Sequence, residues 1–109
     1  NKPEMQQQLE KEFFKAAKIS NISLIPAGRA FLAINKNFPN INLYTEDLRH
    51  PSKEGTYLAA LMVFTTLSNK SPVGNKYIMG LDPEIASTLQ ETAWKTHKEF
   101  KKIFLDSSL

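Results

Sequence analysis

The chain has 109 residues, of which 41% are hydrophobic, and this composition predicts one packed domain rather than a disordered segment. Its net charge of +3 is small, and its lysines are scattered among glutamates without the basic stripe that follows a phosphate backbone, so we expect no nucleic-acid partner. The lack of cysteine excludes disulfides, a thiolate nucleophile and cysteine-ligated metals.

The N-terminal part of the sequence predicts an amphipathic helix. Its first residues, NKPEMQQQLEKEF, are polar and unlike a signal peptide, as expected of a mature or truncated chain, and no apolar run is long enough to span a membrane. Over residues 3–18, apolar side chains recur at steps of three and four, which indicates one buried helical stripe. The stripe consists of Met5, Leu9, Phe13 and Ala16 or Ala17.

The next segment, ISLIP (22–26), is a continuous apolar run ended by a proline, and it predicts a short strand buried on both faces, as in a parallel sheet. AGRAFLAINKN (27–37) then predicts a short helix. FPNINLYTEDLRHP (38–51) predicts an irregular loop bounded by two prolines.

Two further helices are predicted after this loop. Ser52 is expected to cap a helix that continues to about Leu67 and, being apolar on most sides, is largely buried. SNKSPVGN is expected to be a loop. Asp82 then caps a last helix with Pro83 in its first turn, and that helix runs toward the C-terminus. Its inner face is traced by Ile85, Leu89, Ala93, Thr96, Phe100 and Ile103.

This inventory contains one parallel-type strand and no second strand to pair with it. A lone buried strand leaves backbone donors and acceptors without partners, which is costly. Either ISLIP is not a strand, or the rest of its sheet lies outside these residues. The second option makes residues 1–109 a single segment of a larger α/β unit.

Asp47 and His50 are the candidate catalytic residues. In serine hydrolases a histidine takes the hydroxyl proton, and a carboxylate on its other ring nitrogen fixes the tautomer and stabilises the imidazolium. A separation of three residues in a turn allows the carboxylate to reach the ring. The alternative interpretation is structural, with Asp47 as a turn residue and His50 as a helix-entry residue before Pro51.

The stretch EDLRHPSKEGTYLAALMVFTTLSNKSPVG resembles the last sequence block of the SGNH (GDSL-like) hydrolases, particularly members of the carbohydrate-esterase type. ISLIPAGRAF is similar to that family's final parallel strand and the turn after it. MQQQLEKEFFKAAKI and LDPEIASTLQETAWKT resemble the helices on either side. The resemblance covers nearly the whole chain and follows the family's order.

This resemblance implies a three-layer α/β/α (flavodoxin-like) fold of which the chain is the C-terminal part. It also implies that Asp47 orients His50 and that His50 acts as general base and then acid in the hydrolysis of short-chain or carbohydrate acyl esters. No cofactor and no metal are implied. Relatives are often exported by bacteria, which leaves the compartment of this chain open.

The nucleophile and the oxyanion hole of such a site are missing from the sequence. No glycine-aspartate-serine run is present, and the four glycines fall in segments already matched to the family's end. We therefore expect the isolated chain to be inert and a serine to come from an upstream segment or a second chain. Ser52 is assigned to helix capping, and Tyr44 and Arg49 are the candidate substrate contacts.

Other residues have simpler interpretations. Tyr57 and Trp94 are expected in the core, and His97 on a solvated helix face among lysines rather than at a metal. A second functional hypothesis remains open: a non-catalytic helical interaction module that docks on a partner through the N-terminal helix or the apolar helix at residues 57–67.

Overall fold

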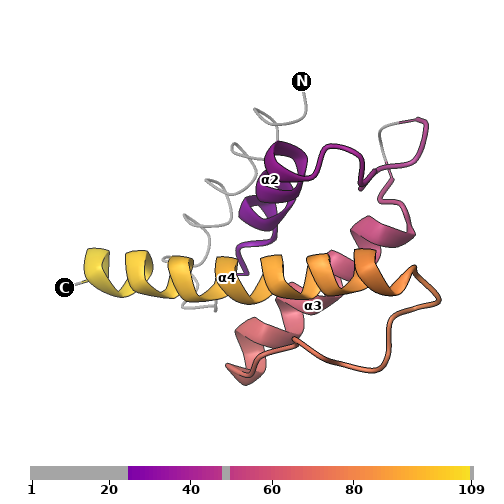
Figure 1. Cartoon of the computed structure of the whole chain (residues 1–109). Helices are drawn as coiled ribbons and strands as arrows, with labels where there is room; N and C mark the ends of the chain where they lie inside the picture. Colours follow the sequence, from indigo (N-terminus) through magenta and orange to yellow (C-terminus); the bar gives the residue numbers. More distant parts are fainter. Residues whose placement is uncertain (1–24, 48–49, 109) are drawn as a thin grey trace.

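The computed structural model describes residues 25–47 and 50–108. Within them three helices follow one another along the chain: α2 (Ala27–Asn37), α3 (Lys53–Ser68) and α4 (Pro83–Ser108). Each helix packs against the other two, and α3 crosses the long α4 (Figure 1). The predicted helix at 27–37, the two loops and the two later helices are confirmed, whereas the N-terminal helix predicted at 3–18 lies outside the described residues.

The core is formed where the three helices meet. Four of its members, Ile34 of α2, Leu58 and Met62 of α3 and Leu89 of α4, have almost no exposed surface. Small residues, Ala30, Ala86 and Ala93, allow the helices to approach closely between them. The cluster consists of Ala30, Phe31, Ile34, Leu43, Tyr57, Leu58, Leu61, Met62, Leu81, Ala86, Leu89 and Ala93.

Both predicted helix caps are present. Ser52 precedes α3 and its hydroxyl oxygen accepts a hydrogen bond from the Gly55 amide at 3.1 Å. Asp82 precedes α4, and its Oδ2 accepts from the amides of Glu84 and Ile85 at 3.1 and 3.2 Å. These bonds satisfy amide groups that the first turn of a helix leaves without intrahelical partners, so each helix begins at its cap.

A buried glutamine holds the loop between α3 and α4. Gln90 is 3% exposed, and its side-chain amide donates to the Tyr57 hydroxyl at 2.9 Å and to the Asn75 carbonyl at 3.0 Å. Its Oε1 accepts from the Gly74 amide at 3.0 Å, while the Tyr57 hydroxyl donates to the Tyr77 carbonyl at 2.8 Å. Tyr57 is buried as predicted, and the loop is fixed because backbone groups that face the protein are paired there.

The expected three-layer α/β/α fold is wrong for the part of the chain that the structure describes, which contains three helices and no strand or sheet. In such a fold each helix would place its apolar face on a sheet, whereas here the faces of α2, α3 and α4 cover one another. Of the predicted strand at 22–26, Ile25 and Pro26 lead directly into α2, and 22–24 lie outside the described residues. A short apolar run does not distinguish a buried strand from the approach to a helix.

The prediction that α3 is largely buried is confirmed on one side only. Val63, Phe64 and Leu67 are 41%, 40% and 70% exposed, because α2 and α4 cover the opposite side of the helix. None of the helices in residues 25–47 and 50–108 combines the length and the hydropathy that crossing a membrane requires.

Candidate functional site

Asp47 and His50 lie on the loop that joins α2 to α3. The loop turns back on itself through one antiparallel bridge between Tyr44 and Pro51. Around the bridge, the Thr45 amide donates to the His50 carbonyl at 2.9 Å and the Ser52 amide donates to the Leu43 carbonyl at 2.8 Å. Residues 43–45 and 50–52, the two arms of the turn, are therefore held together on both sides of the bridge.

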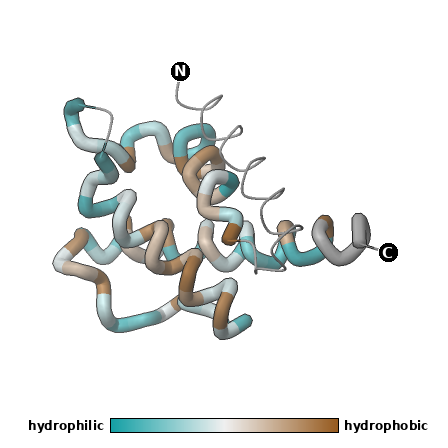
Figure 2. The backbone as a smooth tube through the Cα atoms, turned by 180° about the vertical axis from the view of Figure 1, so that it is seen from behind, coloured by the Kyte–Doolittle hydropathy of each residue, from teal (hydrophilic) through white to brown (hydrophobic). Residues whose placement is uncertain are grey.

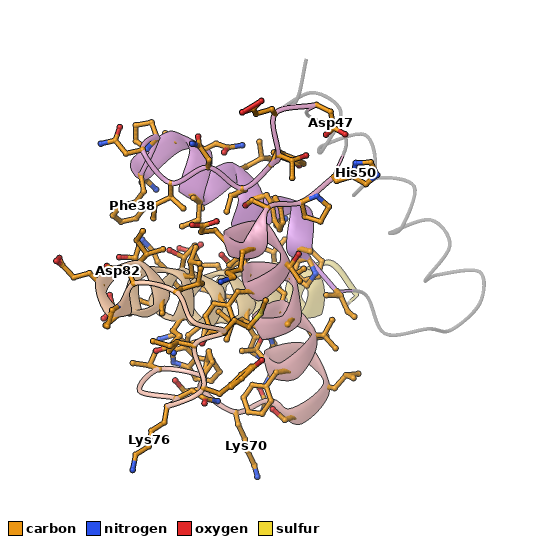
Figure 3. The ribbon with its side chains drawn as sticks, turned by 90° about the vertical axis from the view of Figure 1, so that its right-hand side faces the viewer. Phe38, Asp47, His50, Lys70, Lys76 and Asp82 are labelled. Atoms are coloured by element: carbon orange, nitrogen blue, oxygen red, sulfur yellow. The ribbon has the colours of Figure 1, made fainter. Side chains whose placement is uncertain are left out.

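The two candidate catalytic side chains are in contact. His50 Nδ1 lies 2.9 Å from Asp47 Oδ2, and the two side chains are close together at the tip of the loop in Figure 3. Asp47 Oδ1 accepts a hydrogen bond from the Thr45 hydroxyl at 2.6 Å and a long one from the His50 amide at 3.4 Å. Thus one carboxylate oxygen is held by the loop and the other is directed at the imidazole ring.

This geometry selects one tautomer of His50. A proton on Nδ1 donates to the carboxylate, which leaves the lone pair on Nε2 for a substrate or a nucleophile. No residue of 25–47 or 50–108 hydrogen-bonds to Nε2, and the His50 side chain is largely exposed. Orientation of a histidine by a carboxylate on its Nδ1 is the arrangement found in a Ser-His-Asp triad.

The Asp47–His50 pair lies at an exposed and hydrophilic point of the surface. The side chains of His50 and Asp47 are 74% and 50% exposed. Figure 2 shows hydrophilic residues around this end of the loop. Water screens the attraction between the two groups here, so the pair needs a covering surface before it can hold a reacting ester away from bulk solvent.

Nearby hydroxyls are already engaged. The Ser52 hydroxyl donates to the Asn42 carbonyl at 2.6 Å and accepts from Gly55, which confirms its assignment as a cap. The Thr45 hydroxyl is bonded to Asp47. Within the described ranges, no serine or threonine hydroxyl is hydrogen-bonded to the His50 ring.

Tyr44, one of the two predicted substrate contacts, is half-buried and packs its ring against Phe31 with centroids 5.8 Å apart. It also lines an open groove of about 390 Å³ beside the loop, together with the polar residues Asn35, Asn42, Thr45 and Glu46. Arg49, the other predicted contact, lies outside the described residues. Tyr44 therefore remains a candidate for substrate contact.

The prediction that His97 lies on a solvated face is wrong. His97 is 8% exposed, its Nε2 is 2.8 Å from Asn69 Oδ1, and its ring stacks on half-buried Trp94 with centroids 5.6 Å apart. Asn69 is the left-handed residue that ends α3, and Lys101 also donates to its side-chain oxygen at 3.3 Å. The sequence could not indicate this contact because it joins residues 28 positions apart.

We expect acid to destabilise the folded chain through His97. Burial, and secondarily the Lys101 charge, lower the pKa of His97 below 6.5, so below pH 6.5 the unfolded chain binds a proton that the folded chain excludes. The free energy of unfolding then decreases as the pH is lowered, by at most about 1.4 kcal/mol per pH unit, until the pH passes the pKa of His97 in the folded chain. Urea unfolding at several pH values measures this slope, which His97→Gln should reduce.

Comparisons with known proteins do not extend the likeness described from the sequence. No protein-family model, curated protein or solved structure matches this chain. No group of histidine and acidic side chains suited to a metal ion occurs in the described part of the chain. The geometry of the Asp47–His50 pair is therefore the main structural indication of a chemical role.

Proposed function

We propose that Asp47 and His50 are the acid and base of a Ser-His-Asp site of SGNH type that hydrolyses short-chain or carbohydrate acyl esters. The observation that supports this proposal is the 2.9 Å contact from His50 Nδ1 to Asp47 Oδ2 on a largely exposed His50 side chain. The proposal rests on this pair and on the resemblance of the surrounding sequence to the last block of the SGNH hydrolases. The helical unit described above replaces the α/β/α fold that the same likeness implied.

In this proposal the nucleophilic serine comes from an upstream segment or from a second chain that covers the exposed loop. His50 Nε2 removes the serine proton as the hydroxyl oxygen attacks the ester carbonyl, and the resulting imidazolium is stabilised by Asp47. His50 then returns the proton to the departing alcohol. Water repeats the sequence on the acyl-enzyme. Donors for the oxyanion must also come from the covering surface.

A fluorophosphonate, which phosphonylates activated serines, tests this proposal. The whole preparation is treated with the reagent and examined by denaturing intact-mass spectrometry. We expect an adduct on a longer chain that includes these residues or on a second chain that copurifies with them. If the preparation contains only the 109-residue chain and that chain is unlabelled, it is not a hydrolase by itself; if a serine-bearing partner is present and unlabelled, the proposal is contradicted.

A second function, that of a non-catalytic interaction module, is favoured by the outward face of α3. Thr56, Ala60, Val63, Phe64 and Leu67 recur at helical spacing on this face and are all exposed. No charged residue occurs in the sequence between Glu54 and Lys70. A contiguous apolar surface of this kind is typical of a site that binds another protein.

Leu67→Lys separates a docking role of this face from a role in the chain's own fold. Leu67 is 70% exposed, so we expect the isolated variant to keep its helical circular dichroism and to melt at the wild-type temperature. Loss of a copurifying partner, measured by light scattering, would then support the module. A lower melting temperature of the isolated chain would show that Leu67 stabilises its own fold and would contradict the docking role.

A further inference from the structure

The loop between α3 and α4 exposes two large apolar side chains. Val73 is 46% exposed and Tyr77 is 71% exposed, while Leu67 in the last turn of α3 adds a third exposed side chain beside the loop. The chain's own fold gains nothing from leaving such side chains in water. A surface that gathers them is therefore a candidate for contact with a partner.

The loop is held in a conformation that keeps these side chains outside. Pro72 is fully buried, and the Gly74 amide donates to Oε1 of buried Gln90 at 3.0 Å. Val73 lies between these two anchors. The Tyr77 carbonyl accepts a hydrogen bond at 2.8 Å from a buried tyrosine of α3. Because the backbone is fixed on both sides of the exposed positions, the exposure of Val73 and Tyr77 is a property of the fold.

The loop also carries lysines without acidic neighbours in the sequence. No acidic residue occurs between Glu54 and Asp82, whereas Lys70 and Lys76 both lie in this stretch. Figure 3 shows the two lysines projecting from one end of the molecule, apart from Asp82 and opposite the end that holds the candidate catalytic pair. This end of the molecule therefore presents positive charge next to exposed apolar side chains.

A third lysine reaches the same end from α4. Lys101 Nζ donates to Asn69 Oδ1 at 3.3 Å, and Asn69 directly precedes Lys70. Within residues 25–47 and 50–108, none of the three lysines forms an ion pair with a carboxylate. Their charges are thus not neutralised by the described part of the chain and are available to an anionic partner.

We propose that this end of the molecule binds the surface of a membrane that contains anionic lipids. The binding surface, called the loop end below, consists of Lys70, Val73, Lys76, Tyr77 and Lys101. Lysines near such a surface are attracted by its negative potential. Tyrosine is favoured at the boundary between headgroups and acyl chains, and an exposed valine gains from entering the same layer. The contact is peripheral.

A lipid surface suits the loop end better than an acidic protein does. Lys70 and Lys76 project outward, so a rigid partner would need a depression of matching shape, whereas a fluid bilayer adapts to projecting side chains (Figure 3). The two lysines also lie three residues before and three residues after Val73. When the valine enters the headgroup layer, their long stems allow the ammonium groups to remain at the level of the phosphates.

Cosedimentation of the full chain with lipid vesicles tests this inference. We expect vesicles of phosphatidylcholine and phosphatidylglycerol to bind the chain about tenfold or more tightly than vesicles of phosphatidylcholine alone. Lys70→Gln with Lys76→Gln should weaken binding by about 25-fold, or about fivefold for each lysine. Absence of binding to the anionic vesicles would overturn the inference.

The matched control is Lys36→Gln with Lys102→Gln. These two lysines line a groove between α2 and α4, and their replacement removes the same charge from a different part of the surface. We expect this double variant to weaken binding by less than about threefold, because salt screens charges that do not lie at the membrane. Equal losses in the two double variants would show attraction by net charge alone and would contradict a specific loop end.

An environment-sensitive dye tests whether the apolar part of the loop end enters the headgroup layer. The chain has no native cysteine, so Val73→Cys can be labelled at one position with a nitrobenzoxadiazole dye. We expect its emission to brighten and to shift to the blue when anionic vesicles are added. The same dye on Asn37→Cys, at the exposed end of α2, should not respond. No change at residue 73, or equal changes at both positions, would overturn the inference.

Soluble polyglutamate tests the alternative partner, an acidic protein. It offers negative charge without an apolar layer, so we expect the chain to bind it more weakly than the anionic vesicles. Equal or tighter binding to polyglutamate would assign the loop end to acidic proteins and would overturn the lipid proposal. None of these results depends on whether the Asp47–His50 pair is catalytic, because that pair lies at the opposite end of the molecule (Figure 3).

Discussion

If the proposed hydrolase function is right, replacing His50 with alanine is expected to lower kcat/KM for ester hydrolysis by a factor of about 10²–10⁴ in the serine-bearing protein or complex. The reason is that His50 supplies the ring nitrogen that would act as base in the proposed reaction. Asp47 is held toward the ring by the bond at 2.9 Å, so Asp47→Asn should also reduce the rate by favouring the wrong tautomer.

Initial rates with a chromogenic acetyl ester measure both effects. Glu91→Gln, which removes an exposed carboxylate of α4, serves as the control for a change in net charge. Substrate binding is separated from chemistry by fitting kcat and KM individually, since loss of a base acts mainly on kcat. Unchanged turnover in His50→Ala would show that the contact between Asp47 and His50 is structural.

The second large effect is expected on stability, at Gly55 in the first turns of α3. A Cβ added there would collide with the Leu43 carbonyl oxygen and would also lie 3.2 Å from the Pro51 Cβ. Because the Leu43 carbonyl belongs to the backbone, it cannot rotate away as a flexible side chain could. We expect Gly55→Ala to lower the free energy of unfolding by about 1–3 kcal/mol, the usual effect of overpacking.

The sign of this effect is informative, because Gly→Ala at an open helical position stabilises by about 0.4–1 kcal/mol. Urea unfolding followed by circular dichroism measures it. Thr56→Ala, at the neighbouring exposed position of the same helix, should change the value by no more than about 0.5 kcal/mol. A stabilised Gly55→Ala variant would mean that the loop does not press on α3.

Features encoded by neighbouring residues were predicted from the sequence. The caps at Ser52 and Asp82 depend on bonds across two or three positions, and both are confirmed. The contact between Asp47 and His50 also spans only three residues, and its spacing indicated that the carboxylate could reach the ring.

Features set by distant contacts were not predicted. The predicted α/β/α fold was wrong because hydrophobic periodicity identifies an apolar helix face without identifying what covers it. Another helix can cover that face as well as a sheet can. For the same reason His97 was placed in solvent, although Asn69 and Trp94 enclose it. The bond from Gln90 to Tyr57 joins positions 33 apart and had no signal in the sequence.

The conformation of the loop that holds Asp47 and His50 is determined by contacts between residues close together in the sequence. Its ties, from Thr45 to His50, from Ser52 to Leu43 and from Ser52 to Asn42, span ten residues or fewer. A loop conformation held by such local hydrogen bonds does not require a particular arrangement of helices or strands around it. Likeness in this short stretch is therefore compatible with a helical body unlike the sandwich in which the same residues would be expected.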